Sequence, residues 1–331
     1  MKAILFDEIS SIRKILSNIF ILNELLKNKK SFNKCYASLD LLEDTECAIK
    51  YYKDIDFETD NYGQNYILIY GLFEAFYIQT QAVECLLDAL RIGKNIAKTE
   101  LDILFNIREI RHDIAGHPAC RDDNKPNYSV YLSQPSLSKE QIMYRKSDND
   151  SFITINVLKE IEQQEENILK ILKKTFEHLK REERRHYLKY KDKKITEIFD
   201  DRYIYYYGKI FNEHDFEFAL NGLQKILQDF KNELNKRYTN WQEMNSVSLY
   251  IKDIDEIFTY LNHEYKKLNI DDDNIAFIKK NIVENLKTKF DNLIEVAKEI
   301  DMEYQKYFKN KKNKKVISPS ITFIDFPEKN I

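Results

Sequence analysis

Apolar side chains recur at the three- and four-residue spacing of α-helices along most of this 331-residue chain, and this pattern limits the fold more than any other feature. The chain has only 6 glycines and 5 prolines, too few turn-forming residues for a sandwich or barrel of many short strands. Hydrophobic residues make up 43% of the sequence, which is too many for a disordered protein. We therefore expect an all-α fold.

The periodic segments predict several long helices. The segment 65–93 is apolar on nearly every side, as is typical of the central helix of a bundle. The segment that begins at Thr99 is expected to end near Gly116, because Pro118 follows directly. The other helices are expected over about 7–29, 32–52, 157–191, 195–235, 245–267 and 272–308.

Residues 119–156 have a different character. Short β-prone runs at 128–132, 141–145 and 152–155 are separated by polar segments, which predicts a small hairpin or a three-stranded meander inserted between helices.

These segments suggest three parts of the chain. We expect a helical bundle over 1–192 that contains the β insert, a C-terminal helical domain over 193–308 and a basic tail over 309–331. No linker rich in glycine or proline separates the two helical parts.

Charge and hydropathy narrow the functional classes. The net charge of -3 gives no overall basic field, so any nucleic-acid binding requires a local patch. No apolar run is long enough to cross a membrane, and the richest one contains Glu74. Acidic residues appear from Asp7 onward, too early for a signal peptide, and the four cysteines include no C-x-x-C pair. We expect a reduced, cytoplasmic protein that contacts no membrane.

One arginine lies in an unexpected place. On a helical wheel, Arg111 falls inside the apolar arc between Leu104 and Ile107, and Arg108 lies at the edge of that arc. A guanidinium on an apolar face costs free energy unless it meets an anion or a wet cleft. One explanation is structural, a pair with a carboxylate such as Glu84 on the helix over 65–93. The other is a functional site.

The residues after Arg111 favour a functional site. Positions six apart on a continuous helix point away from each other, so Arg111 and His117 could not meet on an unbroken helix. A helix break at Gly116 would let the imidazole fold back toward the arginine. The sequence therefore predicts that Arg111 and His117 converge on one pocket.

The segment RHDIAGH, from Arg111 to His117, resembles the R-x4–6-H motif of HEPN domains, and His112 matches the polar residue that usually follows the arginine. The helical setting of about residues 1–190 is also similar to that family, whereas the β insert and the helices over 195–308 are not general features of it. The resemblance implies a metal-independent endoribonuclease without a cofactor. It also implies a homodimer in which two motif copies form one composite active site.

The chemistry implied by this resemblance suits these residue types. RNA supplies its own nucleophile, the 2′-OH, so the protein has to move protons and stabilise charge. His117, with an ordinary pKa of ~6.5, would act as general base or acid, and Arg111 would stabilise the phosphate to give a 2′,3′-cyclic phosphate and a 5′-OH. Auxiliary candidates are His112, Asp113, Glu84 and Arg108. For Asp113, capping or a salt bridge is the equally good alternative, and for Glu84 a structural pair with Arg111 is favoured.

Two further clusters have simpler explanations. The basic stretch over 173–194 is a candidate track for the RNA backbone, and a solvated helix face is its alternative. The cations proposed for this track are Lys180, Arg181, Arg184 and Arg185. His112, His117 and Cys120 lack a fourth metal ligand nearby, so no metal site is expected.

The main hypothesis is an endoribonuclease of a toxin or anti-phage defence system. Its expected partners are RNA, a second copy of the chain, and an antitoxin or other regulatory protein. The alternative is a catalytically silent HEPN-like module that binds a partner protein or serves as a scaffold. A DNA-directed or nucleotide-binding protein is a more distant alternative.

Overall fold

The computed structural model confirms an all-α fold with a small β insert. The chain divides into two compact units, Met1–Glu182 and Glu183–Ile331. None of the helices in the described part of the chain is both long and apolar enough to cross a bilayer. The structure describes residues 2–17, 25–26, 28–57, 61–116, 128–147, 151–238, 241–243, 245–263 and 273–312.

The boundary between the units lies inside the long helix α6 (Val157–Tyr190), whereas the sequence placed it at 192/193, just after this helix. The sequence of α6 contains neither glycine nor proline, so no residue in it indicates where one unit ends and the next begins.

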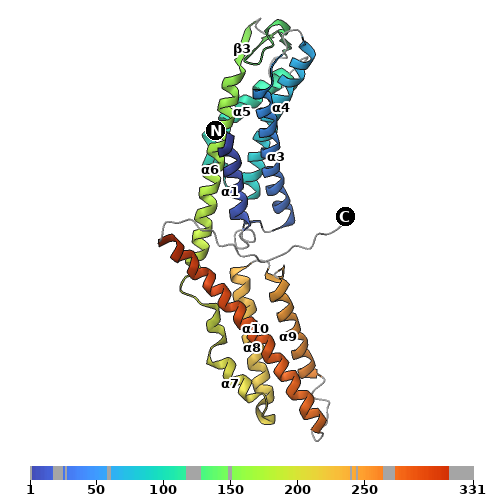
Figure 1. Cartoon of the computed structure of the whole chain (residues 1–331), viewed down its shortest axis with the longest axis vertical. Helices are drawn as coiled ribbons and strands as arrows, with labels where there is room; N and C mark the ends of the chain where they lie inside the picture. Colours follow the sequence, from blue (N-terminus) through green and yellow to red (C-terminus); the bar gives the residue numbers. More distant parts are fainter. Residues whose placement is uncertain are drawn as a thin grey trace. The chain divides into compact units, whose positions relative to one another are not determined.

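The first unit is built from α1 (Lys2–Leu16), α3 (Lys29–Asp54), α4 (Tyr62–Ala89), α5 (Lys98–Arg111) and the first part of α6. A 3-10 turn, Lys94–Ala97, precedes α5. Figure 1 shows α3 and α4 side by side along most of their length. The predicted helix over 7–29 corresponds to α1, and residues 18–24 lie outside the described residues.

The helix α4 is buried on only part of its surface, although its sequence is apolar on nearly every side, as is typical of the central helix of a bundle. Phe73 and Phe76 are buried, but Ile67 is 73% exposed and Tyr70 is 37% exposed. These two residues lie on the same side of α4 as the half-buried Glu74. Helix α4 therefore presents a partly apolar face to its surroundings.

The insert is a three-stranded antiparallel meander, β1 (Val130–Leu132), β2 (Gln141–Lys146) and β3 (Phe152–Asn156), in the order β1-β2-β3. This confirms the three-stranded alternative of the sequence analysis. In Figure 1 the sheet lies at the end of the first unit where α6 begins. Its inner face is buried through Ile142, Tyr144 and Ile155.

The second unit contains the end of α6, α7 (Asp201–Lys209), α8 (Phe216–Arg237), α9 (Asn245–His263) and α10 (Asp273–Lys312). Aromatic rings contribute to its core, where Phe199 and Phe258 both pack against Phe290. The predicted basic tail overlaps the end of α10 up to Lys312, and residues 313–331 lie outside the described residues.

One carboxyl group of the second unit lies in an unfavourable environment for its charge. Burial raises the pKa of Glu303 to about 7, although the Tyr187 hydroxyl of α6 donates a hydrogen bond of 3.3 Å to it. The ordinary pKa of a glutamate is about 4.3, so folding favours the protonated form.

We predict that Glu303→Gln removes a pH dependence of stability. Between pH ~4.5 and ~7 the unfolded chain loses the Glu303 proton while the folded chain keeps it, so the stability of the wild type falls as pH rises. The variant should be more stable than wild type by about 3 kcal/mol at pH 8 and nearly equal to it at pH 4.5. Urea unfolding across this range measures the effect. The exposed Glu299→Gln, one turn earlier, is the control and should keep the wild-type slope.

Candidate active site

The candidate motif begins where α5 changes its geometry. The α-helix ends at Arg111 and continues directly into a π-helical turn, His112–Gly116. The sequence predicted a helix that ends at Gly116, and the structure shows that the last turn before this glycine is the wider π form. Such turns are rare and often lie at functional sites, because they change the direction of the side chains that follow.

Arg111 is paired with a carboxylate of α4. Its Nε and Nη2 atoms donate to Glu74 Oε2 at 3.0 and 2.6 Å. Its guanidinium carbon lies 4.8 Å from the ring centroid of Tyr77, one turn further along α4. The Arg111 side chain is 19% exposed and that of Glu74 is 42% exposed, so the pair lies at the surface of the unit rather than in its core.

The expected pair between Arg111 and Glu84 is wrong. Glu84 lies nearly three turns beyond Glu74 on α4, and its carboxylate forms an ion pair with Lys94 in the 3-10 turn before α5. The chain between the two helices thus supplies the cation for Glu84. No contact in the described part of the chain joins Glu84 to the motif.

Arg108 brings a second guanidinium to the same ring. Its guanidinium carbon lies 5.0 Å from the ring centroid of Tyr77. Within the described ranges, no acidic side chain lies within ion-pair distance of Arg108. Arg108, Arg111 and Glu74 together have one net positive charge, which suits the single negative charge of a phosphodiester.

The structure describes one of the two histidines of the motif, His112. His112 packs edge-on against Tyr77, with 6.3 Å between the ring centroids, so the residue after the arginine belongs to the same cluster. His117, Pro118 and Cys120 lie outside the described residues. The convergence of Arg111 and His117 stays a prediction.

Asp113 anchors the π-turn to the β insert. The residue is 4% exposed, and its carboxylate accepts hydrogen bonds from the hydroxyls of Tyr128, at 2.8 Å, and Tyr144, at 3.1 Å. Lys146 Nζ lies 2.8 Å from the same carboxylate. This arrangement agrees with the salt-bridge alternative of the sequence analysis.

The environment of Lys146 keeps its ammonium charged. Burial acts to lower the pKa of Lys146, but the hydrogen bond and the charge of Asp113 outweigh it, so the pKa lies above its ordinary value. The ammonium also lies 4.7 Å from the ring centroid of Tyr128. Asp113 and Lys146 thus form an ion pair between the π-turn and β2, in which Asp113 is buried and Lys146 is half-buried.

The sequence analysis missed Glu74 and Tyr77 as members of the cluster, and it missed Lys146. Glu74 did leave a signal, because it interrupts the most apolar run of the chain. Tyr77 shares a helix face with Glu74, so the signal extends to it. Lys146 left no signal, because the pairing of distant segments decides its contact with Asp113.

The candidate RNA track on α6 forms a solvated face. Lys180, Arg181, Arg184 and Arg185 are all exposed. The ammonium of Lys180 lies 4.0 Å from the ring centroid of Phe176 on the same helix. The structure therefore agrees with the alternative of a solvated helix face and does not test RNA binding there.

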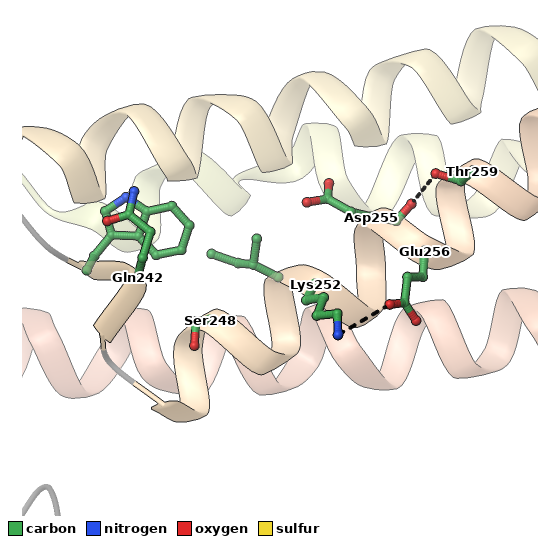
Figure 2. A pocket seen from close by; sticks show the side chains of 8 residues that line it. Gln242, Ser248, Lys252, Asp255, Glu256 and Thr259 are labelled. Atoms are coloured by element: carbon green, nitrogen blue, oxygen red, sulfur yellow. Dashed lines mark hydrogen bonds and ion pairs between the residues drawn. The ribbon is translucent and has the colours of Figure 1, made fainter.

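A hollow of about 460 Å³ lies elsewhere, on the second unit, between Trp241 and α9 (Figure 2). Its charged side chains are already neutralised, because Lys252 pairs with Glu256 at 3.7 Å and Asp255 pairs with Lys231 at 2.7 Å. The hollow shares no residue with the Arg111 cluster. Across the described ranges, His, Cys, Asp and Glu residues form no group of three suited to a metal ion.

Comparison with known proteins identifies no relative. No family model matches this sequence. No curated protein matches it in sequence, and no solved structure matches it.

We predict that Lys146→Met destabilises the protein by about 3 kcal/mol, because it removes the ammonium that lies 2.8 Å from the buried Asp113 carboxylate. Arg145→Met on the same strand is the control and should cost less than about 1 kcal/mol, because Arg145 is exposed. Urea unfolding at pH 7 measures both. Equal effects of the two substitutions would show that the ion pair contributes nothing specific.

Proposed function

We propose that the protein is a metal-independent endoribonuclease of HEPN type, with its active site at the π-turn after α5. The observation that carries the proposal is the cluster of Arg108 and Arg111 around Tyr77. Two guanidiniums and one carboxylate give this cluster one excess positive charge at the surface of the unit. Such a site suits an anionic group with the charge and size of a phosphodiester.

In this proposal Arg111 binds the scissile phosphate. Two of its five N–H groups point at Glu74 Oε2, and the remaining N–H groups have no hydrogen-bond acceptor within the described ranges. Glu74 fixes the orientation of the guanidinium, and the remaining N–H groups would donate to the phosphate oxygens as negative charge develops. Arg108 would add a second positive charge without a carboxylate to compete for it.

His117 is assigned the proton transfer. As general base it would take the proton of the 2′-OH, which attacks the adjacent phosphorus while the bond to the 5′-oxygen breaks. The leaving 5′-oxygen receives a proton, which yields a 2′,3′-cyclic phosphate and a 5′-OH. His112, held against Tyr77, would orient the substrate or share the proton transfer.

The proposal includes a homodimer through the exposed face of α4. Ile67 and Tyr70 lie on this face, and Glu74 and Tyr77 continue it toward Arg111. Exposed apolar residues grouped beside a polar site are typical of interaction surfaces. A second copy packed on this face would bring the two arginine clusters toward each other and complete a composite site.

The alternative, a catalytically silent binding module, has one observation in its favour. The pair with Glu74 gives Arg111 a structural partner, so the arginine does not require a substrate to explain its position. In this case the exposed α4 face would bind a partner protein. A role in toxin or anti-phage systems, with an antitoxin as regulator, belongs to the enzyme hypothesis.

We predict that the purified protein cleaves RNA in the presence of EDTA and leaves cyclic-phosphate and 5′-OH ends. Arg111→Ala and His117→Ala should each lower the cleavage rate at least about 100-fold, because each removes a group that acts on the transition state. Arg202→Ala, on the exposed start of α7, is the matched control and should cleave as wild type does. Gel analysis with end-specific labelling measures rate and products.

Two outcomes would reject the enzyme hypothesis. One is intact RNA with wild-type protein, both alone and with cell extract as a source of activators. The other is cleavage that persists in His117→Ala, which would point to a contaminating nuclease. Growth of cells that express wild type or His117→Ala adds a second readout, since only an active, unregulated nuclease slows growth.

We predict that Ile67→Lys converts the dimer into a monomer and abolishes cleavage, because a charge in the centre of the apolar α4 face would be desolvated on association. Ile204→Lys is the matched control, because Ile204 is also exposed, at 69%, but lies on α7 of the second unit. This substitution should leave the mass of the dimer unchanged. Light scattering after gel filtration measures the mass. A wild-type monomer, or an Ile67→Lys dimer, would contradict the α4 interface.

A further inference from the structure

The outer face of the β insert displays a row of side chains that runs across all three strands. Tyr131 on β1 lies opposite Arg145 on β2, and Arg145 lies opposite Phe152 on β3. Residues in one register row of an antiparallel sheet project from the same face. Tyr131 is 60% exposed and Phe152 is 65% exposed, and Arg145 is also exposed.

The other strand side chains of this face are uncharged. Alternation along β2 and β3 places Gln141, Met143 and Thr154 on the same side as the row. The strand residues of this face therefore include one cation, Arg145, which already has an interaction partner in the folded chain, and no carboxylate. Large aromatic side chains left this exposed lose the free energy that burial would provide, and two of them flank a single arginine.

We infer that the Tyr131–Arg145–Phe152 row binds single-stranded RNA by stacking bases on its two aromatic rings. Neighbouring strands lie about 4.8 Å apart, so the rings on β1 and β3 are about 10 Å apart and can each take one base. Arg145 lies between them and reaches the phosphate or the base edges. Exposed aromatics on a sheet are a common platform for unpaired bases.

The size of this face favours a short stretch of RNA over a protein. Three strands of about five residues present roughly 250 Å², whereas each partner of a stable protein complex buries about 800 Å². Two or three nucleotides fit the smaller area. A short stretch of RNA therefore fits the area of this face.

The platform is physically connected to the candidate active site. The opposite face of β2 carries Tyr144 and Lys146, which hold the Asp113 carboxylate of the π-turn. An RNA strand held by the outer face would thus be kept at a fixed distance from the π-turn. The choice of RNA rests on the proposed function, so the test measures binding and not cleavage.

The test compares full-length variants that all carry His117→Ala, so that the probe stays intact. The probe is a fluorescein-labelled single-stranded RNA of twelve nucleotides, in EDTA, and fluorescence anisotropy measures its dissociation constant. Tyr131→Leu with Phe152→Leu should weaken binding at least tenfold, because leucine keeps the apolar character but cannot stack. The exchanged pair, Tyr131→Phe with Phe152→Tyr, should bind within twofold of the parent.

Two controls separate stacking from general attraction. Tyr205→Leu with Phe218→Leu replaces two exposed aromatics of the second unit, 53% and 54% exposed, and should bind RNA as the parent does. The same RNA annealed to its complement should bind at least tenfold more weakly, because its bases are not available for stacking.

Each contrary result overturns the platform. The first two are a parent protein that does not bind RNA and a Tyr131→Leu, Phe152→Leu variant that binds RNA within twofold of the parent. The other two are a Tyr205→Leu, Phe218→Leu variant that loses as much affinity as the Tyr131→Leu, Phe152→Leu variant, and a duplex that binds as tightly as the single strand. The RNA-binding proposal and the nuclease proposal can be rejected independently of each other. Binding that depends on the row without cleavage by wild type rejects only the nuclease, and cleavage with row-independent binding rejects only the platform.

Discussion

The buried carboxylate of Asp113 is the constraint on which the candidate site depends. At 4% exposure it requires the tyrosine hydroxyls and the ammonium of Lys146 that surround it. These donors come from the β insert, so the packing of the sheet stabilises the position of the π-turn. The insert is thus a structural support of the motif and not an accessory to the bundle.

Helix α4 serves two purposes that conflict in a monomer. One side fills the core with Phe73 and Phe76, and the other exposes Ile67 and Tyr70 while Glu74 holds Arg111. An exposed apolar side beside a charged cluster costs free energy in the isolated unit, and a second copy packed there would recover it. The proposed dimer thus accounts for both the apolar composition of α4 and the position of Arg111 at the surface.

Much of the fold was predictable because helical periodicity is a local property. The three strands of the insert and the long α6 lie close to their predicted ranges. Arg111 was singled out because it lies on an apolar helix face, and in the structure it pairs there with the carboxylate of Glu74. The identity of the anion was not predictable, since Glu74 and Glu84 both lie on α4 and only the packing of α5 selects between them.

The sequence by itself determined the helical class, the β insert and the unusual position of Arg111, because each follows from the order of neighbouring residues. Tertiary structure alone decided that Glu74 is the partner of Arg111 and that Lys146 neutralises Asp113. It also decided that Tyr131, Arg145 and Phe152 form one exposed row. The physical reason is that ion pairs and strand registers join residues far apart in the chain, and only the packing of whole elements brings such residues together.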